Sequence, residues 1–390
     1  MSLNYTTFPL TDNFTLTTPV NGTPPCVYLK VDAGTVTYAA FMVLVMIVAL
    51  LGNSLVCIAV GLSPKLRQDP TTYFIISLAV SDMAFAIFQA PMKISIKLNN
   101  NNFCFGIGAC LMLVLSDLIL TPATIITLFV IAADRFYCID KPFLYQEKVT
   151  KKKAKIVVAL VWLCACIVAS LFLFKWDDPS QPSVKGPGCI TDNKYFYSML
   201  NFLVILIPLV IMGIMYSIIL RIALSHIRAI KKTSRLLTVQ DENENRRSSK
   251  MSQRRAHREL RVTATLAMVY GAFVICWLPM CIVNIIMGIK KEVLLGSYRK
   301  VPEIFVIIFD CLPMVSTAVN PIIYNFTNKQ FRMAFKVAMH RLLGNREILR
   351  RATVIKELGS YGKKEARFQR AATMEMRHVN GDKDKVLPRL

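Results

Sequence analysis

A small set of charged side chains interrupts the long apolar stretches of this sequence: Asp82, Lys93, Asp117, Asp134, Arg135 and Asp310. A charge at the centre of a bilayer costs roughly 2.5–3.5 kcal/mol on insertion scales, so such residues are candidates for function. The sequence offers no nucleophile paired with a base and no His/Cys cluster at zinc spacing, which argues against an enzyme. The chemistry that these groups can do is electrostatic, because a carboxylate can hold a cationic ligand, a metal ion or a neighbouring cation.

Seven apolar segments are long enough to carry these charges into a membrane, since about 20 residues cross a ~30 Å hydrocarbon core. The segments are 37–62, 71–97, 106–138, 155–174, 195–225, 260–288 and 302–326. The composition agrees, because 54% of the 390 residues are hydrophobic and 18% are charged, against about a quarter charged in soluble domains. The net charge of +23 comes from basic residues between the apolar segments. That placement favours cytoplasmic loops in contact with anionic lipid, and no nucleic-acid partner is expected.

Two features indicate the orientation of the chain in the membrane. Three glycosylation sequons, at Asn4, Asn13 and Asn21, crowd the N-terminal tail and favour an extracellular location. The connection 226–259, with ten Lys and Arg against four acids, then lies inside, as the positive-inside rule expects. The basic loop 289–301 lies outside and is an exception. We expect a multi-pass plasma-membrane protein with an extracellular N-terminus.

Four regions follow from this reading, in an all-α membrane protein built as a seven-transmembrane helix bundle. They are an extracellular glycosylated tail at 1–36, the bundle at 37–326, a short amphipathic membrane-surface helix at 327–344, and a disordered cytoplasmic tail at 345–390. The polar stretch 236–258 is also expected to be largely disordered, because it lacks sustained apolar periodicity.

Each apolar segment carries a short motif. In chain order these are Gly52-Asn53, Ser77-Leu78-Ala79-Val80-Ser81-Asp82, Asp134-Arg135-Phe136, Trp162, Pro208 with Tyr216, Phe273 with Cys276-Trp277-Leu278-Pro279, and Asn320-Pro321-Ile322-Ile323-Tyr324. Over roughly 37–343 the chain therefore resembles a rhodopsin-like (class A) G protein-coupled receptor. Phe136 departs from the tyrosine that the family usually has. The resemblance implies a receptor that activates heterotrimeric G proteins, with arrestin and a receptor kinase as further possible partners.

The resemblance also implies a sodium pocket in mid-membrane, with no other cofactor. Its residues would be Asp82, Asn53, Thr124, Ser316 and Asn320. Oxygen ligands around a buried carboxylate suit a hard cation. The alternative is a hydrogen-bond network completed by water alone.

The activation switch implied by the family centres on Arg135, beside Asp134 in the third segment, with Glu259 at the base of the sixth as its resting-state partner. Breaking that pair would let the sixth segment swing outward. The residues that would transmit or stabilise the change are Ile125, Pro208, Phe273, Tyr216, Asn320, Pro321 and Tyr324. Phe143, in the second inner loop, would contact the G protein together with Arg135.

Four cysteines, Cys26, Cys104, Cys110 and Cys189, lie where an oxidising compartment could pair them. The family resemblance implies a disulfide between Cys110 and Cys189. Cys26 and Cys104 could form a second bridge or remain thiols.

The ligand class is the least determined property. The implied contacts are Asp117, Thr121, Trp277, Asn284 and Asp310. Asp117 stands where amine receptors hold an ammonium group, so a biogenic amine or another small cation is the leading expectation. An internal salt bridge from Lys93 to Asp117 or to Asp310 is the alternative role for these charges.

Other ligand classes stay open. Thr121 and Asn284 resemble nucleoside contacts of adenosine receptors, and the basic loop 289–301 would suit an anionic or peptide ligand; a lipid ligand is also possible. A transporter or channel would be a different class of function. It would predict internal repeats or rings of charge along a pore, and the sequence has neither.

Overall fold

The computed structural model of the protein describes residues 32–99, 103–173, 189, 196, 199–236, 243–289, 302–327 and 329–342. Within these ranges the chain forms helices and no strand. The helices are α1 (Ala33–Leu62), α2 (Pro64–Gln68), α3 (Thr71–Leu98), α4 (Gly106–Asp140), α5 (Pro142–Lys148), α6 (Lys151–Leu173), η1 (Asn201–Leu206), α8 (Ile207–Leu236), α9 (Asn243–Ile289), α11 (Pro302–Val306), η2 (Ile307–Cys311), α12 (Leu312–Thr327) and α13 (Lys329–Leu342).

Seven helical stretches within the described residues are long and apolar enough to cross a membrane, which confirms the predicted seven-span, all-α fold. The fifth joins η1 to the start of α8, over Asn201–Ile222, and the sixth is the Thr263–Ile286 part of α9. The seventh, Glu303–Thr327, joins α11, η2 and α12. The short helix α13 follows it, where the amphipathic helix was predicted.

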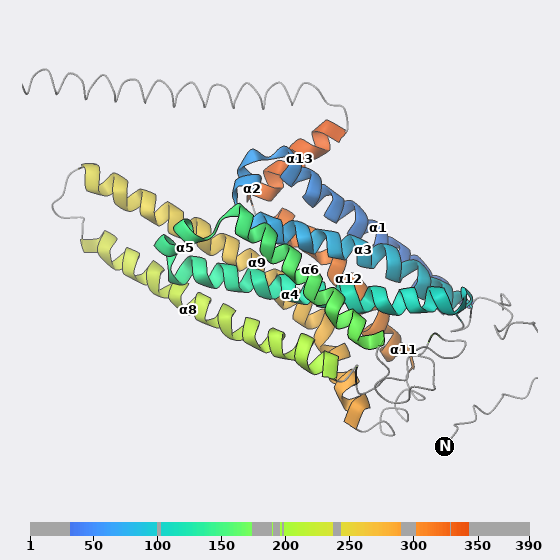
Figure 1. Cartoon of the computed structure of the whole chain (residues 1–390). Coiled ribbons are helices and arrows are strands. Elements are labelled where there is room, and N and C mark those ends of the chain that lie inside the picture. The colour runs from blue at the N-terminus through green and yellow to red at the C-terminus, as the bar shows by residue number, and fades with distance from the viewer. Residues whose placement is uncertain are drawn as a thin grey trace, which may run out of the picture.

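The helix α4 runs through the middle of the bundle and packs against α3, α6, α8 and α9. On one side, α1 packs against α3 and α12, and α13 returns to contact α1 and α12. Figure 1 shows α2 and α5 at the same end of the bundle as α13 and the long extensions of α8 and α9. We call this the α5 end, and the opposite end, where α11 lies, the α11 end.

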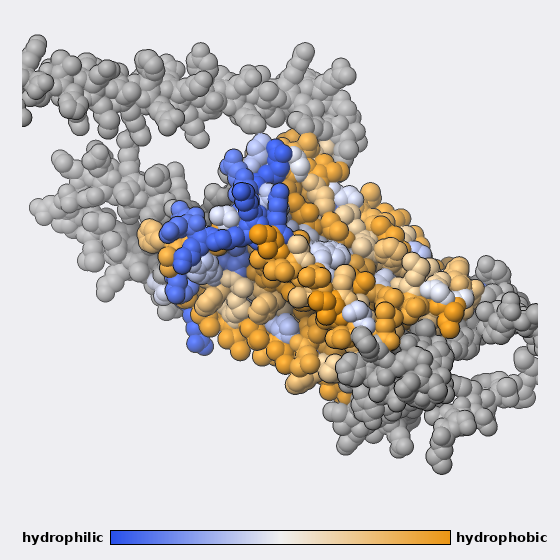
Figure 2. Space-filling model, in the orientation of Figure 1, coloured by the Kyte–Doolittle hydropathy of each residue, from blue (hydrophilic) through white to orange (hydrophobic). Residues whose placement is uncertain are grey.

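The surface agrees with a membrane location. Figure 2 shows hydrophobic residues over the flank of the bundle and hydrophilic residues gathered near the α5 end. Many large apolar side chains point outward from the spans, among them Leu51, Ile275 and Leu220, which are 68%, 70% and 59% exposed. A flank of this kind would be costly in water and is expected against lipid.

Two spans contain a π-helical segment that ends two residues before a proline. Pro313 has no N–H, so it cannot donate to the carbonyl of Phe309 four residues earlier, and the preceding turn, η2 (Ile307–Cys311), uses the wider i→i+5 pattern. The segment η1 (Asn201–Leu206) precedes Pro208 in the same way. Such π segments are frequent at functional sites, and both belong to spans that reach the α11 end.

The expected disorder of 236–258 is wrong for most of that stretch. Residues 243–258 are the first part of α9, which continues without a break to Ile289. Extending an existing helix adds one hydrogen bond for each residue that is fixed, so an apolar span can carry a polar, charge-rich extension that would not form a helix alone. The tails at 1–31 and 343–390, including Asn4, Asn13 and Asn21, lie outside the described residues.

Candidate functional site

A buried ion pair lies at the α5 end of α4. Arg135 Nη2 is 2.6 Å from Asp134 Oδ2, and the two residues are 3% and 9% exposed. Thr71 of α3 donates its hydroxyl to the same oxygen at 2.7 Å, and Tyr145 of α5 donates to Asp134 Oδ1 at 2.8 Å. The Arg135 guanidinium also hydrogen-bonds to Thr71 and, at 3.3 Å, to Tyr145. A buried pair is tolerated when further hydrogen bonds satisfy its remaining atoms, and here two neighbouring helices supply them.

Tyr145 is a member of this cluster that no motif indicates. Burial raises the pKa of its hydroxyl well above the usual range, so the group remains a hydrogen-bond donor to Asp134. Glu259, the predicted partner of Arg135, lies on α9, and its side chain is outside the described part of the structure. The Arg135–Glu259 pair therefore stays a prediction. Phe143 of α5 is 88% exposed, so its aromatic ring is accessible at this end.

A second polar cluster lies inside the bundle around Asp82 of α3, which is 2% exposed. Asn320 of α12 donates to Asp82 Oδ2 at 2.7 Å. Beside Asp82 in the chain, the Ser81 hydroxyl accepts a hydrogen bond from Thr124 of α4 at 3.0 Å. The structure thus brings Asp82 and Asn320 into direct contact, and Thr124 reaches the adjacent residue of α3.

The other two predicted sodium ligands are bonded elsewhere. The Ser316 hydroxyl accepts from the Trp277 indole N–H at 3.0 Å, and Asn53 Nδ2 donates to the carbonyls of Ala49 and Thr317, both at 2.9 Å. The buried oxygen Asn53 Oδ1 has no hydrogen-bond donor among the described residues. A buried carboxylate, hydroxyls and an unsatisfied amide oxygen form a donor set whose chemistry suits a hard cation.

Aromatic packing connects this cluster to the sixth span. The rings of Phe273 and Trp277 stack with centroids 5.4 Å apart, and Phe85 of α3 meets Trp277 edge-on at 6.1 Å. Ile125 is fully buried in the same hydrophobic core as Phe273, and Pro208 is the second residue of α8, directly after η1. The residues of the predicted trigger therefore lie on helices that pack together in the middle of the bundle.

Two tyrosines of the predicted switch are buried towards the α5 end. Tyr216 stacks on Tyr270 of α9 with centroids 5.2 Å apart, and Tyr324 stacks on Phe331 of α13 at 5.4 Å. The Tyr324 hydroxyl has no hydrogen-bond partner in the described part of the chain. An unsatisfied buried hydroxyl costs about 1–3 kcal/mol, so an arrangement that gives Tyr324 a partner would gain that free energy.

At the α11 end, Lys93 of α3 pairs with Asp310 of η2, with 2.9 Å between Nζ and Oδ1. The Lys93 ammonium also donates to the Phe309 carbonyl at 2.9 Å, and Tyr38 of α1 donates its hydroxyl to Asp310 Oδ2 at 3.3 Å. The sequence left two carboxylates open as the partner of Lys93. The structure selects Asp310, which leaves Asp117 outside the ion pair.

Asp117 of α4 accepts a hydrogen bond from Thr121, one helical turn away, at 3.1 Å, and it remains partly exposed. Lys93 lies one helical turn from Gln89 of α3, whose amide donates to Ser116 beside Asp117, and its ion pair is with Asp310 and not with Asp117. The Asn284 amide of α9 donates to Asn201 Oδ1 of η1 at 3.2 Å. Of the five predicted ligand residues, the structure joins Asp117 directly to Thr121, whereas Asp310, Asn284 and Trp277 bond to other residues.

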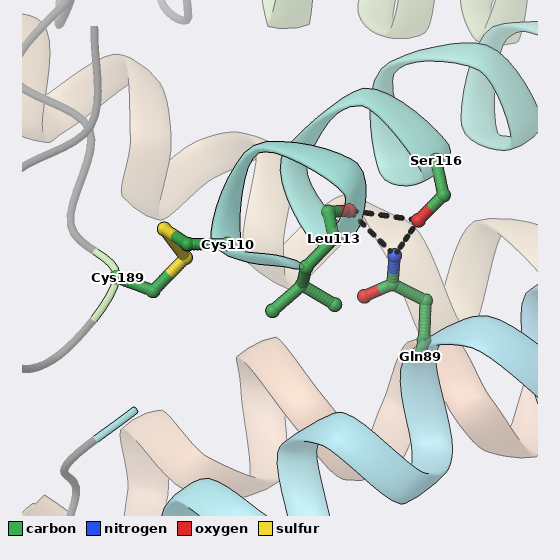
Figure 3. Close-up of a disulfide and its surroundings, with 5 residues drawn as sticks. All are labelled: Gln89, Cys110, Leu113, Ser116 and Cys189. Carbon is green, nitrogen blue, oxygen red and sulfur yellow. Dashed lines mark hydrogen bonds between the residues drawn. A yellow bond between two sulfur atoms is a disulfide. The ribbon is translucent and has the colours of Figure 1, made fainter. Parts of the chain in front are cut away.

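The predicted disulfide between Cys110 and Cys189 is confirmed, with Cα atoms 5.5 Å apart. It ties the start of α4 to the segment before the fifth span (Figure 3). Cys104 is disulfide-bonded as well, and its partner lies outside the described residues, as does Cys26.

Three polar residues of the spans also take part in this region although no motif indicates them. Gln89 of α3 donates to the Leu113 carbonyl at 3.1 Å and to Ser116 at 2.9 Å, which joins α3 to α4 near the disulfide (Figure 3). Asn201 and Tyr38 join η1 to α9 and α1 to η2. Their signal in the sequence is the presence of a polar group in an apolar segment, where it needs a partner.

The sequence is similar to those of known membrane receptors. The protein-family model described as 7 transmembrane receptor (rhodopsin family) matches residues 52–324 of this chain. The chain is 28% identical to the rat adenosine receptor A2b, over 81% of this chain and 92% of that receptor. It is 30% identical to the human adenosine receptor A2b, over 78% and 90%, and 31% identical to a D(1)-like dopamine receptor of Takifugu rubripes, over 77% and 70%.

These relatives are receptors and not enzymes, and the matched residues 52–324 include every predicted motif from Gly52 to Tyr324. The chain belongs to the rhodopsin-like, class A family of G protein-coupled receptors.

Proposed function

We propose that this receptor binds a small cationic ligand, with a biogenic amine as the best candidate, through the carboxylate of Asp117. The observation that carries the proposal is that, of the two carboxylates at the α11 end, Asp310 is paired with Lys93 and Asp117 is not. Lys93 is held by Asp310 and the Phe309 carbonyl, whereas the hydrogen bond to Asp117 comes from a neutral hydroxyl, that of Thr121. A carboxylate in a partly buried site gains a charge-assisted hydrogen bond when an ammonium group binds to it.

The same proposal assigns the α5 end to the G protein. The Arg135 guanidinium is buried with Asp134, Thr71 and Tyr145, which is a resting arrangement in which it is not available to a partner. Release of Arg135 on outward movement of α9 would expose a cationic side chain beside Phe143. In a cell this end would face the cytoplasm, where arrestin and a receptor kinase could also act, and the glycosylated N-terminus would face outward at the plasma membrane.

Sodium is proposed as an allosteric ion near Asp82. The support is the chemistry of the surrounding groups, a buried carboxylate with hydroxyl and amide oxygens. A bound cation would offset the cost of burying the charge of Asp82, which otherwise rests on the hydrogen bond from Asn320.

A nucleoside is the second candidate ligand. Two of the relatives above are adenosine receptors, and Asn284, with its neighbour Asn201, offers amide groups at the α11 end. An amide presents both a donor and an acceptor, which is the pattern needed to bind the edge of a base.

The two candidates are separated by a ligand panel read as nucleotide exchange on G proteins in cells. The panel covers biogenic amines, nucleosides, peptides and lipids, and the receptors are the wild type, Asp117→Asn and Asn284→Ala. The amine proposal expects a response to an amine that falls at least 100-fold in potency in Asp117→Asn and survives in Asn284→Ala. A response to a nucleoside that is lost in Asn284→Ala and survives in Asp117→Asn would replace the amine proposal with the nucleoside proposal.

A further inference from the structure

Two carboxylates and one ammonium group share the α11 end of the bundle. Asp310 belongs to η2, Asp117 to α4 and Lys93 to α3. Lys93 forms its ion pair with Asp310, at 2.9 Å, and lies one helical turn from Gln89, whose amide donates to Ser116, the chain neighbour of Asp117. These three side chains carry a formal charge of −1 together, and Asp117 is the carboxylate that is not paired.

The position of Lys93 is set by the backbone of the seventh span as well as by charge. Pro313 cannot donate to the Phe309 carbonyl, and the Lys93 ammonium donates to that carbonyl at 2.9 Å. Tyr38 fixes the other oxygen of Asp310 from α1. The side chains of Lys93 and Asp310 are 21% and 29% exposed, so the pair is shielded but still borders accessible space. Lys93 is thus held in place by a carboxylate and by a carbonyl that lacks its usual helical donor.

We propose that Lys93 is an internal counter-ion that occupies Asp310 and thereby restricts the ligand site to molecules with a single positive charge. The inference rests on the proposed role of Asp117 and adds the charge class of the ligand. A molecule with one ammonium group neutralises Asp117 and leaves the Lys93–Asp310 pair intact. A molecule with two ammonium groups would have to displace Lys93 from both Asp310 and the Phe309 carbonyl, or place its second charge beside a cation.

The proposal predicts that removing Lys93 changes the charge class of the ligand. In Lys93→Met the side chain keeps most of its length but loses its charge, so Asp310 becomes a second unpaired carboxylate at the same end of the bundle as Asp117. A short α,ω-diamine can then bind both carboxylates with one ammonium group each. Since the gain depends on Asp310, it should disappear in the double variant Lys93→Met/Asp310→Asn.

The test uses the full-length receptor, purified in lipid nanodiscs and titrated calorimetrically. The probes are 1,3-diaminopropane, 1,4-diaminobutane and 1,5-diaminopentane, with n-pentylamine as the singly charged control. Lys93→Met should bind its best diamine at least ten-fold more tightly than the wild type does, and the double variant should lose that gain. Lys97→Met, which removes a lysine one helical turn further along α3, should show no gain. A gain that is absent, or that persists without Asp310, would overturn the proposal.

A second measurement does not depend on the folding of Lys93→Met. In Asp310→Asn, Lys93 loses its carboxylate partner and its charge acts on the ligand bound at Asp117, so n-pentylamine should bind at least five-fold more weakly than to the wild type. Equal binding would contradict the counter-ion role. A failure of the amine proposal can be told apart from a failure of the counter-ion proposal. If the amine proposal is wrong, n-pentylamine binding will not change in Asp117→Asn. The counter-ion proposal is tested separately, by whether the tighter diamine binding of Lys93→Met depends on Asp310.

Discussion

A close approach between α1 and α12 gives a prediction that can be worked out from the structure. Gly52 of α1 lies against the ring of Pro321 in α12, and a Cβ atom added to Gly52 would lie 2.9 Å from both Cβ and Cγ of that ring. Carbon atoms pack best at about 3.5–4.0 Å. The proline ring is fused to the backbone of α12 and cannot rotate away, so Gly52→Ala must push the two helices apart.

The expected cost can be separated from the general effect of replacing glycine by alanine in a helix. Overpacking of this kind costs about 1–3 kcal/mol. The shift also strains the neighbouring hydrogen bond from Asn53 to the Thr317 carbonyl, which adds to the cost. Against this, alanine in place of glycine favours a helix interior by about 1 kcal/mol. Gly61 lies on the same helix with no atom within 4 Å of an added Cβ, so Gly61→Ala shows the helix effect alone.

The measurement is a thermal melt of the two purified variants, compared with the wild type in the same detergent. Gly61→Ala should melt at or slightly above the wild-type temperature. Gly52→Ala should melt below Gly61→Ala by an amount that corresponds to about 1–3 kcal/mol, or roughly 2–12 °C at the 2–4 °C per kcal/mol of a large domain. If Gly52→Ala melts at the same temperature as Gly61→Ala, the two helices do not meet as described.

Three other substitutions test the two ends of the bundle. Tyr145→Phe removes a hydrogen-bond donor to the buried carboxylate of Asp134, and a hydrogen bond to a charged group is worth about 1.5–3 kcal/mol. The melting temperature of this variant should therefore fall, and its basal nucleotide exchange should rise. If both stay unchanged, the role assigned to Tyr145 is wrong. Arg135→Ala should abolish G protein activation while surface expression, measured by antibody labelling, is mostly retained, and normal coupling would rule out the switch. Cys189→Ala should reduce surface delivery, because loss of a native disulfide typically costs about 2–5 kcal/mol, and a fully expressed, active variant would show that the bridge to Cys110 is dispensable.

The spans could be predicted from the sequence because hydrophobic length is a local property. The second segment was expected at 71–97 and α3 covers Thr71–Leu98; the third was expected at 106–138 and α4 covers Gly106–Asp140. The error at 243–258 has a local cause too, since composition alone does not show that a polar segment is continuous with a stable helix.

The partners of the buried charges could be predicted only in part. Helical spacing placed Lys93 near both Asp117 and Asp310, but it could not choose between them. The choice depends on the Phe309 carbonyl, which Pro313 leaves without its usual donor, and backbone groups of a distant span do not appear in a side-chain pattern. Tyr145 was missed for a similar reason, because α5 lies outside the spans and its contact with Asp134 follows from how α5 folds back on α4.

The seventh span shows how the two ends of the receptor can be coupled. Pro313 and Pro321 each leave a carbonyl, that of Phe309 and that of Thr317, without its usual helical donor. In both cases a side chain from another span donates instead: Lys93 from α3 at one point and Asn53 from α1 at the other. Between the two prolines, Ser316 accepts from Trp277 of α9, and Asn320 donates to Asp82 of α3. A helix that is held at two interruptions by side chains can shift by exchanging these bonds without unfolding. On the proposal above, a ligand bound beside Lys93 would act on a span whose contacts already extend to Asp82 and to Trp277, the groups through which the movement would pass towards Arg135.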